Sequence, residues 1–248
     1  MPRSRQSHRA SKSQKAADRS GTRQKRATSG ERRQEFIQKA IDYFAEVGFD
    51  GGTRELAQRL GVTQPLLYRY FPSKEALIGA VYRQIFIDRW DPNWDELLAD
   101  SNRPLRERLH EFYLAYTEVI FAPEWLRIYL FAGLRGVEIN RWYTRVVEDL
   151  VLKRIAAGLR EERGLPTDLP ISRAETEIFW VLHGGIFYYG VRRYIYGLPV
   201  QEDTSAMIAN ALDAFLNGAG AVLDRLAAEQ QAAAQTGSDT KGETGTHD

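Results

Sequence analysis

The side chains with the clearest chemistry in this chain are Gln64, Tyr68 and Arg69, which lie within one short segment. If residues 63–71 form a helix, apolar residues take its inner face and these three polar side chains point outward. An amide, a phenol and a guanidinium group are suited to hydrogen-bonding the base edges and phosphates of a nucleic acid. The segment therefore has the composition of a DNA-reading helix.

Two short helices joined by a tight turn must position these side chains. The first is predicted from Thr53 to Leu60 and carries apolar residues on one face, namely Leu56, Ala57 and Leu60. Gly61 suits the end of this helix because glycine adopts a left-handed backbone without steric cost. Thr63 is predicted to cap the second helix, with Pro65 in its first turn and Leu67, Tyr70 and Phe71 facing inward. This is a helix-turn-helix, whose second helix enters the DNA major groove.

Over about residues 31–87 the chain resembles the TetR family of transcriptional regulators. The resemblance rests on Phe44 and Gly48, followed by T-R-E-L-A at 53–57, L-G-V at 60–62, L-Y-R-Y-F at 67–71 and S-K-E-A-L at 73–77. A lone helix-turn-helix is a weak signal, but Tyr-Phe straight after the recognition helix, followed by S-K-E-A-L at the start of a fourth helix, is a narrow one. The resemblance implies an all-α protein with an N-terminal three-helix helix-turn-helix DNA-binding domain. It also implies a C-terminal helical domain for ligand binding and dimerisation.

The resemblance also assigns roles within the helix-turn-helix. It implies base contacts from Arg54, Gln64, Pro65, Leu66 and Tyr68. It implies phosphate contacts from Thr53, Thr63, Arg69, Tyr70 and Lys74. Arginine can bond guanine and glutamine can bond adenine, whereas apolar side chains contact the thymine methyl group. The alternatives are core packing for the two tyrosines and a solvated surface charge for Arg69 and Lys74.

Two positions depart from the family pattern. Gly51-Gly52 stands where the family usually has a small polar residue before the first motif helix. This difference predicts a looser start of that helix and one phosphate contact fewer. Leu66 is larger than the small residue expected there, which narrows the base edges that can lie opposite.

Composition limits the classes of function. The 248 residues suit two lobes, and 43% hydrophobic residues allow a sizeable core. Cysteine is absent, which excludes disulfides, thiolate catalysis and cysteine metal sites. We find neither an uninterrupted apolar run of membrane-spanning length nor a secretory signal, so we expect a cytoplasmic protein without membrane contact.

The charge is unevenly distributed. The formal net charge is +1, but residues 1–30 combine one acid, Asp18, with nine basic side chains: Arg3, Arg5, Arg9, Lys12, Lys15, Arg19, Arg23, Lys25 and Arg26. This segment has too few large apolar residues to fold alone. We expect a disordered basic arm that contacts DNA phosphates. The alternative is a passive solubilising tail, and residues 231–248 are predicted to form a disordered tail without function.

The rest of the chain predicts two domains. Residues 31–87 form the helix-turn-helix domain, and a break at Asp91-Pro92-Asn93 leads to a helical effector-binding and dimerisation domain over 88–230. Apolar periodicity and prolines predict its helices at 104–121, 123–135, 137–163, 171–196 and 203–230. The last two carry apolar stripes with Gly184, Gly185, Gly190, Gly218 and Gly220. The resemblance implies a homodimer through these helices, and the alternative is that both stripes face one intramolecular core.

Aromatic residues crowd the segment 110–196. The resemblance implies a cavity there whose small-molecule occupant changes DNA affinity, and we expect an apolar or aromatic effector. The predicted lining is Tyr113, Tyr116, Trp125, Tyr129, Trp142, Trp180, His183 and Phe187. If the core is filled instead, the alternative is a ligand-independent DNA-binding protein that recruits a protein partner through an apolar surface patch.

Nothing in the sequence favours an enzyme. The chain has four histidines and no H-E-x-x-H, G-x-S-x-G or phosphate-loop motif. A lone histidine on an apolar helix face, such as His183, is usually a core residue. We therefore expect a double-stranded operator as the main partner, repression as the mode of action, and no catalytic residue, metal or cofactor.

Overall fold

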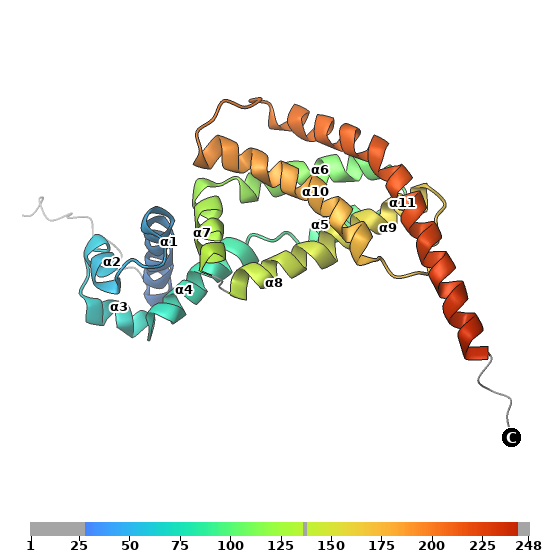
Figure 1. The fold of residues 1–248 in the computed structure, drawn as a ribbon. Helices are drawn as coiled ribbons and strands as arrows, with labels where there is room; N and C mark the ends of the chain where they lie inside the picture. Colours follow the sequence, from blue (N-terminus) through green and yellow to red (C-terminus); the bar gives the residue numbers. More distant parts are fainter. Residues whose placement is uncertain (1–27, 136–137, 243–248) are drawn as a thin grey trace, which may run out of the picture.

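The computed structural model describes residues 28–135 and 138–242, and within these ranges it is helical and contains no strand. The N-terminal bundle comprises α1 (Ser29–Val47), α2 (Thr53–Arg59), α3 (Gln64–Tyr70) and α4 (Lys74–Tyr82). It lies at one end of an elongated helical lobe (Figure 1). The predicted all-α architecture is confirmed, whereas the predicted basic arm lies almost entirely outside the described residues.

Local capping signals set the limits of α1. The Glu31 amide donates to Thr28 Oγ1 at 3.2 Å, and the Thr28 amide donates to the Glu31 carboxylate at 2.6 Å, which forms a capping box. Gly48 ends the helix with a φ of 73°. A side chain there would be strained by this backbone conformation and would also meet Phe131 at 3.3 Å.

The helix-turn-helix is formed as predicted except at one cap. Gly61 has a φ of 67° after α2, and Ser73 caps α4 by accepting from the Ala76 amide at 3.1 Å. Thr63 precedes α3, but its hydroxyl makes no capping hydrogen bond, so that prediction is wrong. The reason is local, because Pro65 has no N–H and the Leu66 amide already donates to the Thr63 carbonyl at 3.0 Å.

The C-terminal lobe consists of seven helices within the described ranges: α5 (Asn93–Ala99), α6 (Leu105–Ile120), α7 (Pro123–Leu134), α8 (Glu138–Val147), α9 (Lys153–Glu162), α10 (Arg173–Gly190) and α11 (Thr204–Gly242). Three π-helical turns continue α4, α8 and α10, namely η1 (Arg83–Ile87), η2 (Glu148–Leu152) and η3 (Val191–Ile195). Helix α5 was not expected in the connection after residue 93. It forms because Trp94 and Leu98 are buried against the lobe.

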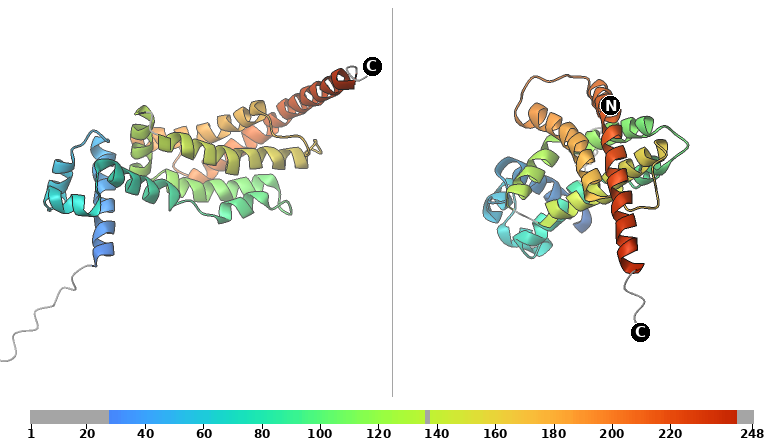
Figure 2. Two further views of the ribbon diagram at one scale, coloured as in Figure 1. Left: turned by 90° about the horizontal axis from the view of Figure 1, so that it is seen from below. Right: turned by 45° about the vertical axis from the view of Figure 1, so that its right-hand side comes forward.

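Helix α11 is longer than predicted. It continues to Gly242, so most of the segment predicted as a disordered tail is helical, and only residues 243–248 lie outside the description. Residues 227–235 consist only of alanine, glutamine and glutamate, which all favour helix and carry α11 past residue 230. Figure 2 shows the end of α11 projecting from the lobe, far from the N-terminal bundle.

The same helix is long and apolar enough over Thr204–Ala232 to meet the length and composition of a membrane span. The sequence reading did not anticipate this, because polar residues interrupt the apolar ones. Core helices of water-soluble proteins meet the same criteria. Here α11 packs against α6 and α10, with Ile208, Leu212 and Leu223 buried.

A buried ion pair joins three helices at the far end of the lobe. The guanidinium of Arg160 donates to both carboxylate oxygens of Glu175 at 2.6 and 2.7 Å, and to Gln230 Oε1 of α11 at 3.0 Å. Burial opposes ionisation of Glu175, but hydrogen bonds from Arg160 and Ser172 hold the pKa of its carboxyl below the usual value. The pair thereby fixes the start of α10 against α9 and α11.

Candidate nucleic-acid interface and candidate ligand cavity

A hydrogen-bonded cluster lies on the outer face of the helix-turn-helix. Thr53 Oγ1, at the start of α2, accepts from Gln64 Nε2 at 3.0 Å and lies 3.1 Å from the Tyr68 hydroxyl. Leu67 is buried on the opposite face of α3, while the Tyr68 side chain is 39% exposed. The cluster orients Gln64 and Tyr68 and leaves the Gln64 carbonyl oxygen and one amide hydrogen free to bond a base.

The other predicted DNA-contacting residues divide into two groups. Arg54, Thr63, Pro65 and Arg69 are exposed, whereas Leu66 and Tyr70 are partly buried. The Tyr70 ring packs edge-on against Phe36, with centroids 5.1 Å apart. The Tyr70 ring is therefore part of the core of the N-terminal bundle.

Lys74 has a partner that the sequence did not reveal. Its Nζ donates to the carbonyl oxygen of Phe49 at 2.6 Å, so it ties α4 to the loop before α2. The ammonium group keeps further N–H donors for a phosphate. Replacing Lys74 would therefore change DNA affinity for two reasons, because it removes both a positive charge and the bond that anchors the loop before α2.

The looser start of α2 at Gly51-Gly52 stays a prediction: Gly52 provides no side-chain cap, but Tyr43 of α1 contacts this segment. The Tyr43 hydroxyl donates to Glu55 Oε2 at 2.9 Å and lies 3.3 Å from the Gly52 carbonyl oxygen, which fixes the start of α2. A Cβ atom at Gly51 would lie 2.5 Å from the Tyr43 hydroxyl, so a side chain has no room there. Burial, followed by the bond to Glu55, raises the pKa of Tyr43 to about 12, so its hydroxyl stays protonated.

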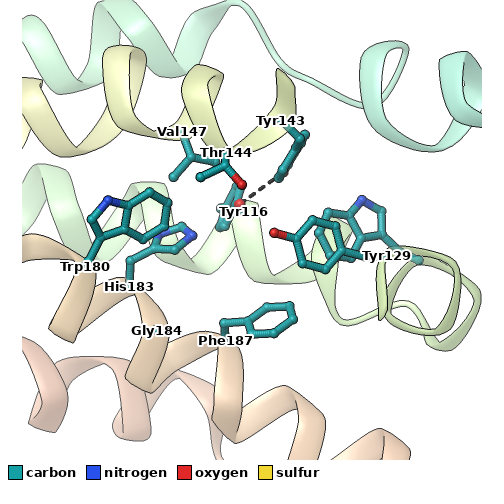
Figure 3. Close-up of a pocket in the computed structure, with 10 residues that line it drawn as sticks. Tyr116, Tyr129, Tyr143, Thr144, Val147, Trp180, His183, Gly184 and Phe187 are labelled. Atoms are coloured by element: carbon teal, nitrogen blue, oxygen red, sulfur yellow. Dashed lines mark hydrogen bonds between the residues drawn. The ribbon is translucent and has the colours of Figure 1, made fainter. Parts of the chain in front are cut away.

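A cavity of about 90 Å³ lies between α6, α7, α8 and α10 (Figure 3). Its lining is mostly aromatic and comprises Tyr116, Trp125, Tyr129, Tyr143, Thr144, Val147, Trp180, His183, Gly184 and Phe187. Six of the eight residues predicted from the sequence are in this lining. The two exceptions are Tyr113 and Trp142.

Helical register explains the two exceptions. On α8 the residues facing the cavity are Tyr143, Thr144 and Val147, which share one face, whereas Trp142 lies beside that face. The i, i+4 spacing of Tyr143 and Val147 was the signal available in the sequence. Tyr113 is fully buried behind His183, with its hydroxyl 3.5 Å from His183 Nδ1.

The cavity carries no charged side chain. Burial lowers the pKa of His183 to about 4, so its imidazole is neutral at pH 7. The hydroxyls of Tyr116 and Tyr143 bond each other at 3.0 Å, and burial raises the pKa of both phenols. The cavity therefore presents neutral polar groups among aromatic rings, which is the composition of a small-molecule site.

Comparison with known proteins identifies the family. Residues 36–81 match the family model for bacterial regulatory proteins of the tetR family. The class A tetracycline repressor from transposon 1721 of Escherichia coli is 39% identical over 90 residues, covering 33% of this chain and 40% of that protein. The regulator RutR of Escherichia coli K12 is 47% identical over 55 residues, covering 22% of this chain and 26% of RutR. The helix-turn-helix domain belongs to the TetR family.

Solved structures extend the TetR-family fold over both lobes. A TetR-like regulator from Rhodococcus sp. RHA1 aligns with a TM-score of 0.57 at 18% identity, covering 78% of this chain and 100% of that one. Mycobacterium smegmatis AmtR aligns with a TM-score of 0.53 at 21% identity, covering 85% of this chain and 97% of that one. The matches by sequence are shorter. They span 40% of the tetracycline repressor and 26% of RutR.

Ring contacts connect the cavity to the helix-turn-helix domain of the TetR family. Phe86, in η1, lies 5.1 Å from Trp125 and 5.5 Å from Tyr143 between ring centroids. From Phe86 the contacts continue at 5.3 to 6.0 Å per pair through Tyr82, Phe49, Phe44 and Tyr43. A second contact between the lobes runs from Arg127 Nε to the Ala45 carbonyl oxygen at 2.9 Å. These packed side chains can therefore transmit a shift of the cavity wall to α4 and α1.

Proposed function

We propose that this TetR-family protein is a sequence-specific DNA-binding transcriptional regulator that represses its target genes. A small apolar or aromatic ligand in the cavity releases it from its operator. The observation that carries the proposal is the cluster of Thr53, Gln64 and Tyr68 on the exposed face of the helix-turn-helix. In this proposal Arg54, Pro65 and Leu66 complete the base contacts, and Thr63, Arg69, Tyr70 and Lys74 contact phosphates.

Operator binding requires a homodimer, and α10 and α11 offer the surface for one. An apolar groove of about 410 Å³ runs between them, lined by Val181, Leu182, Gly185, Ile186, Tyr189, Arg192, Met207, Ala211, Ala214 and Phe215. Val181 is 72% exposed in the single chain, a high value for a large apolar residue. A second copy seated here would present two recognition helices to successive major grooves, about 34–36 Å apart.

The glycines of these helices support different contacts. A Cβ atom at Gly190 would collide with the buried Phe121 ring, so this glycine is needed within one protomer. One at Gly220 would meet only the guanidinium end of Arg163, a flexible side chain that can move aside. A Cβ atom at Gly185 meets no atom within 4 Å, which leaves room for close approach of a partner.

Ligand release follows from linkage between the two sites. A ligand that fits the cavity better in one arrangement of its rings shifts Phe86 and hence α4, which changes the spacing of the two reading heads. Such coupling is typically about 1–3 kcal/mol, and DNA must weaken ligand binding by the same factor. The cavity supports this sensor model over the ligand-independent, partner-recruiting alternative.

Three further parts of the proposal rest on the sequence. Residues 1–30 add phosphate contacts to those of the domain at 31–87, residues 88–230 bind the effector and the second copy, and the protein acts in the cytoplasm. Deleting residues 1–27 should make the slope of log affinity against log salt shallower by several units. An unchanged slope would show that the arm is passive.

The test of DNA reading compares two variants on a panel of mutated near-palindromic operators. Gln64→Ala should cost about 1–3 kcal/mol and relax preference at one base pair. Arg69→Ala should weaken binding to all operator sequences equally and reduce the slope of log affinity against log salt by about 1. Arg69 is the better phosphate control because Lys74 also anchors the Phe49 carbonyl. Identical profiles for the two variants would refute the assigned roles.

A further inference from the structure

We propose that the effector is an uncharged molecule with a hydroxyl or carbonyl group that hydrogen-bonds to Tyr129, and that its remainder leaves the cavity past Gly184. The inference rests on the proposed function, because it takes the cavity as the effector site. It narrows the predicted apolar or aromatic ligand to one chemical class.

The first argument is charge. None of the ten lining residues is an aspartate, glutamate, lysine or arginine, and His183 is neutral at pH 7. A carboxylate, phosphate or ammonium group would lose its hydration in this cavity without gaining a counter-ion, which is a large penalty. Aromatic faces compensate a cation only partly. The lining therefore selects against ions of both signs.

The second argument is the supply of unused hydrogen-bonding groups. The Tyr129 and Thr144 hydroxyls make no hydrogen bond within the described part of the chain. The Tyr116 and Tyr143 hydroxyls share one bond, in which one donates and the other accepts. Figure 3 shows the Tyr129 hydroxyl pointing toward Tyr116 and His183. A wholly apolar ligand would leave these groups without partners. A hydroxyl or carbonyl oxygen on the ligand can accept from Tyr129.

The third argument is size. About 90 Å³ is smaller than an apolar cavity of about 150 Å³ that holds benzene, so a ring can enter only if part of the ligand stays outside or the walls move. Gly184 is the one exposed residue of the lining, and a Cβ atom there meets nothing within 4 Å. The mouth of the cavity is therefore at Gly184.

The test uses four probes that share one ring: benzyl alcohol, toluene, benzoate and benzylammonium. Each is titrated into the full chain at pH 7 by calorimetry, with quenching of Trp125 and Trp180 as a second readout. Benzyl alcohol should bind at least tenfold more tightly than the two ions and measurably more tightly than toluene. Equal or tighter binding of either ion, or no binding by any probe, would overturn the proposal.

Two variants test the residues. Tyr129→Phe should lower the affinity for benzyl alcohol to that of toluene and leave toluene binding unchanged, and Tyr196→Phe, on an exposed tyrosine outside the cavity, is the matched control. Gly184→Leu should lower the affinity for benzyl alcohol about tenfold, because the leucine side chain fills the mouth of the cavity. Equal losses for benzyl alcohol and toluene in Tyr129→Phe would mean that the ring, and not the hydroxyl, binds the ligand, which contradicts the proposal.

Operator titrations separate this inference from the proposed function. If benzyl alcohol binds as expected but leaves operator affinity unchanged, the cavity chemistry stands and the effector role fails. If the protein binds its operator and no probe binds, DNA reading stands and the inference about the ligand fails.

Discussion

Replacing Tyr43 with phenylalanine removes one hydroxyl that holds the start of α2, at a position that contacts no DNA in the proposed complex. The ring is buried and remains in place, so packing changes little. The hydroxyl donates to the Glu55 carboxylate at 2.9 Å and lies 3.3 Å from the Gly52 carbonyl oxygen. The substitution thus isolates the contribution of one hydrogen-bonding group to the geometry of the helix-turn-helix.

The magnitude follows from the partner's charge and exposure. A hydrogen bond to a charged group contributes about 1.5–3 kcal/mol. The Glu55 side chain is 55% exposed, so water competes for the carboxylate and the lower end applies. We expect the free energy of unfolding to fall by about 1.5 kcal/mol. Operator affinity should fall roughly fivefold, about 1 kcal/mol, because Arg54 and Thr53 lose a fixed starting position.

The matched control is Tyr68→Phe, which removes an exposed hydroxyl 3.1 Å from Thr53 Oγ1. Its unfolding free energy should change by less than about 0.5 kcal/mol, while preference at one base pair is relaxed. Both variants are measured by urea unfolding at one fixed protein concentration, since dimer stability depends on concentration, and by operator titration. Unchanged stability in Tyr43→Phe, or a stability loss in Tyr68→Phe as large as in Tyr43→Phe, would refute this reasoning.

Three further variants test other parts of the molecule. Because the folded pKa of His183 is lowered from 6.5 to about 4, the unfolded chain takes up a proton first as pH falls, so stability is lost between pH 6.5 and 4. Lowering pH from 7 to 5 should cost wild type about 2 kcal/mol more than His183→Gln in urea titrations, and equal losses would refute burial as the cause. Gly185→Ala should favour helix by up to about 1 kcal/mol yet weaken dimerisation, and sedimentation showing an unweakened dimer would argue against a close partner helix there. Glu175→Ala strands the buried guanidinium of Arg160 and should cost at least about 3 kcal/mol, and a thermal unfolding midpoint like that of wild type would contradict this.

The sequence alone determined the elements that depend on neighbouring residues. Gly61 adopts the left-handed backbone expected after α2, and Ser73 caps α4, because each signal acts within about one helical turn. Apolar periodicity also located the later helices, because a helix that buries one face has apolar residues spaced three or four positions apart. Thr63 precedes α3 as expected, but its hydroxyl makes no capping bond. Pro65 has no N–H to donate to it, and the Leu66 amide donates to the Thr63 carbonyl instead.

Only the tertiary structure decided which of these faces meet and what they enclose. The contacts of Lys74 with Phe49 and of Tyr43 with Glu55 depend on how α1, α2 and α4 cross, so composition could not reveal these contacts around Gly51-Gly52. The cavity likewise joins Tyr116 to Phe187 from helices distant in sequence. Aromatic residues predicted that such a site could form, but helix register and crossing angle decided that Tyr143 lines it and Trp142 does not, because a side chain contacts only what its helix turns it toward.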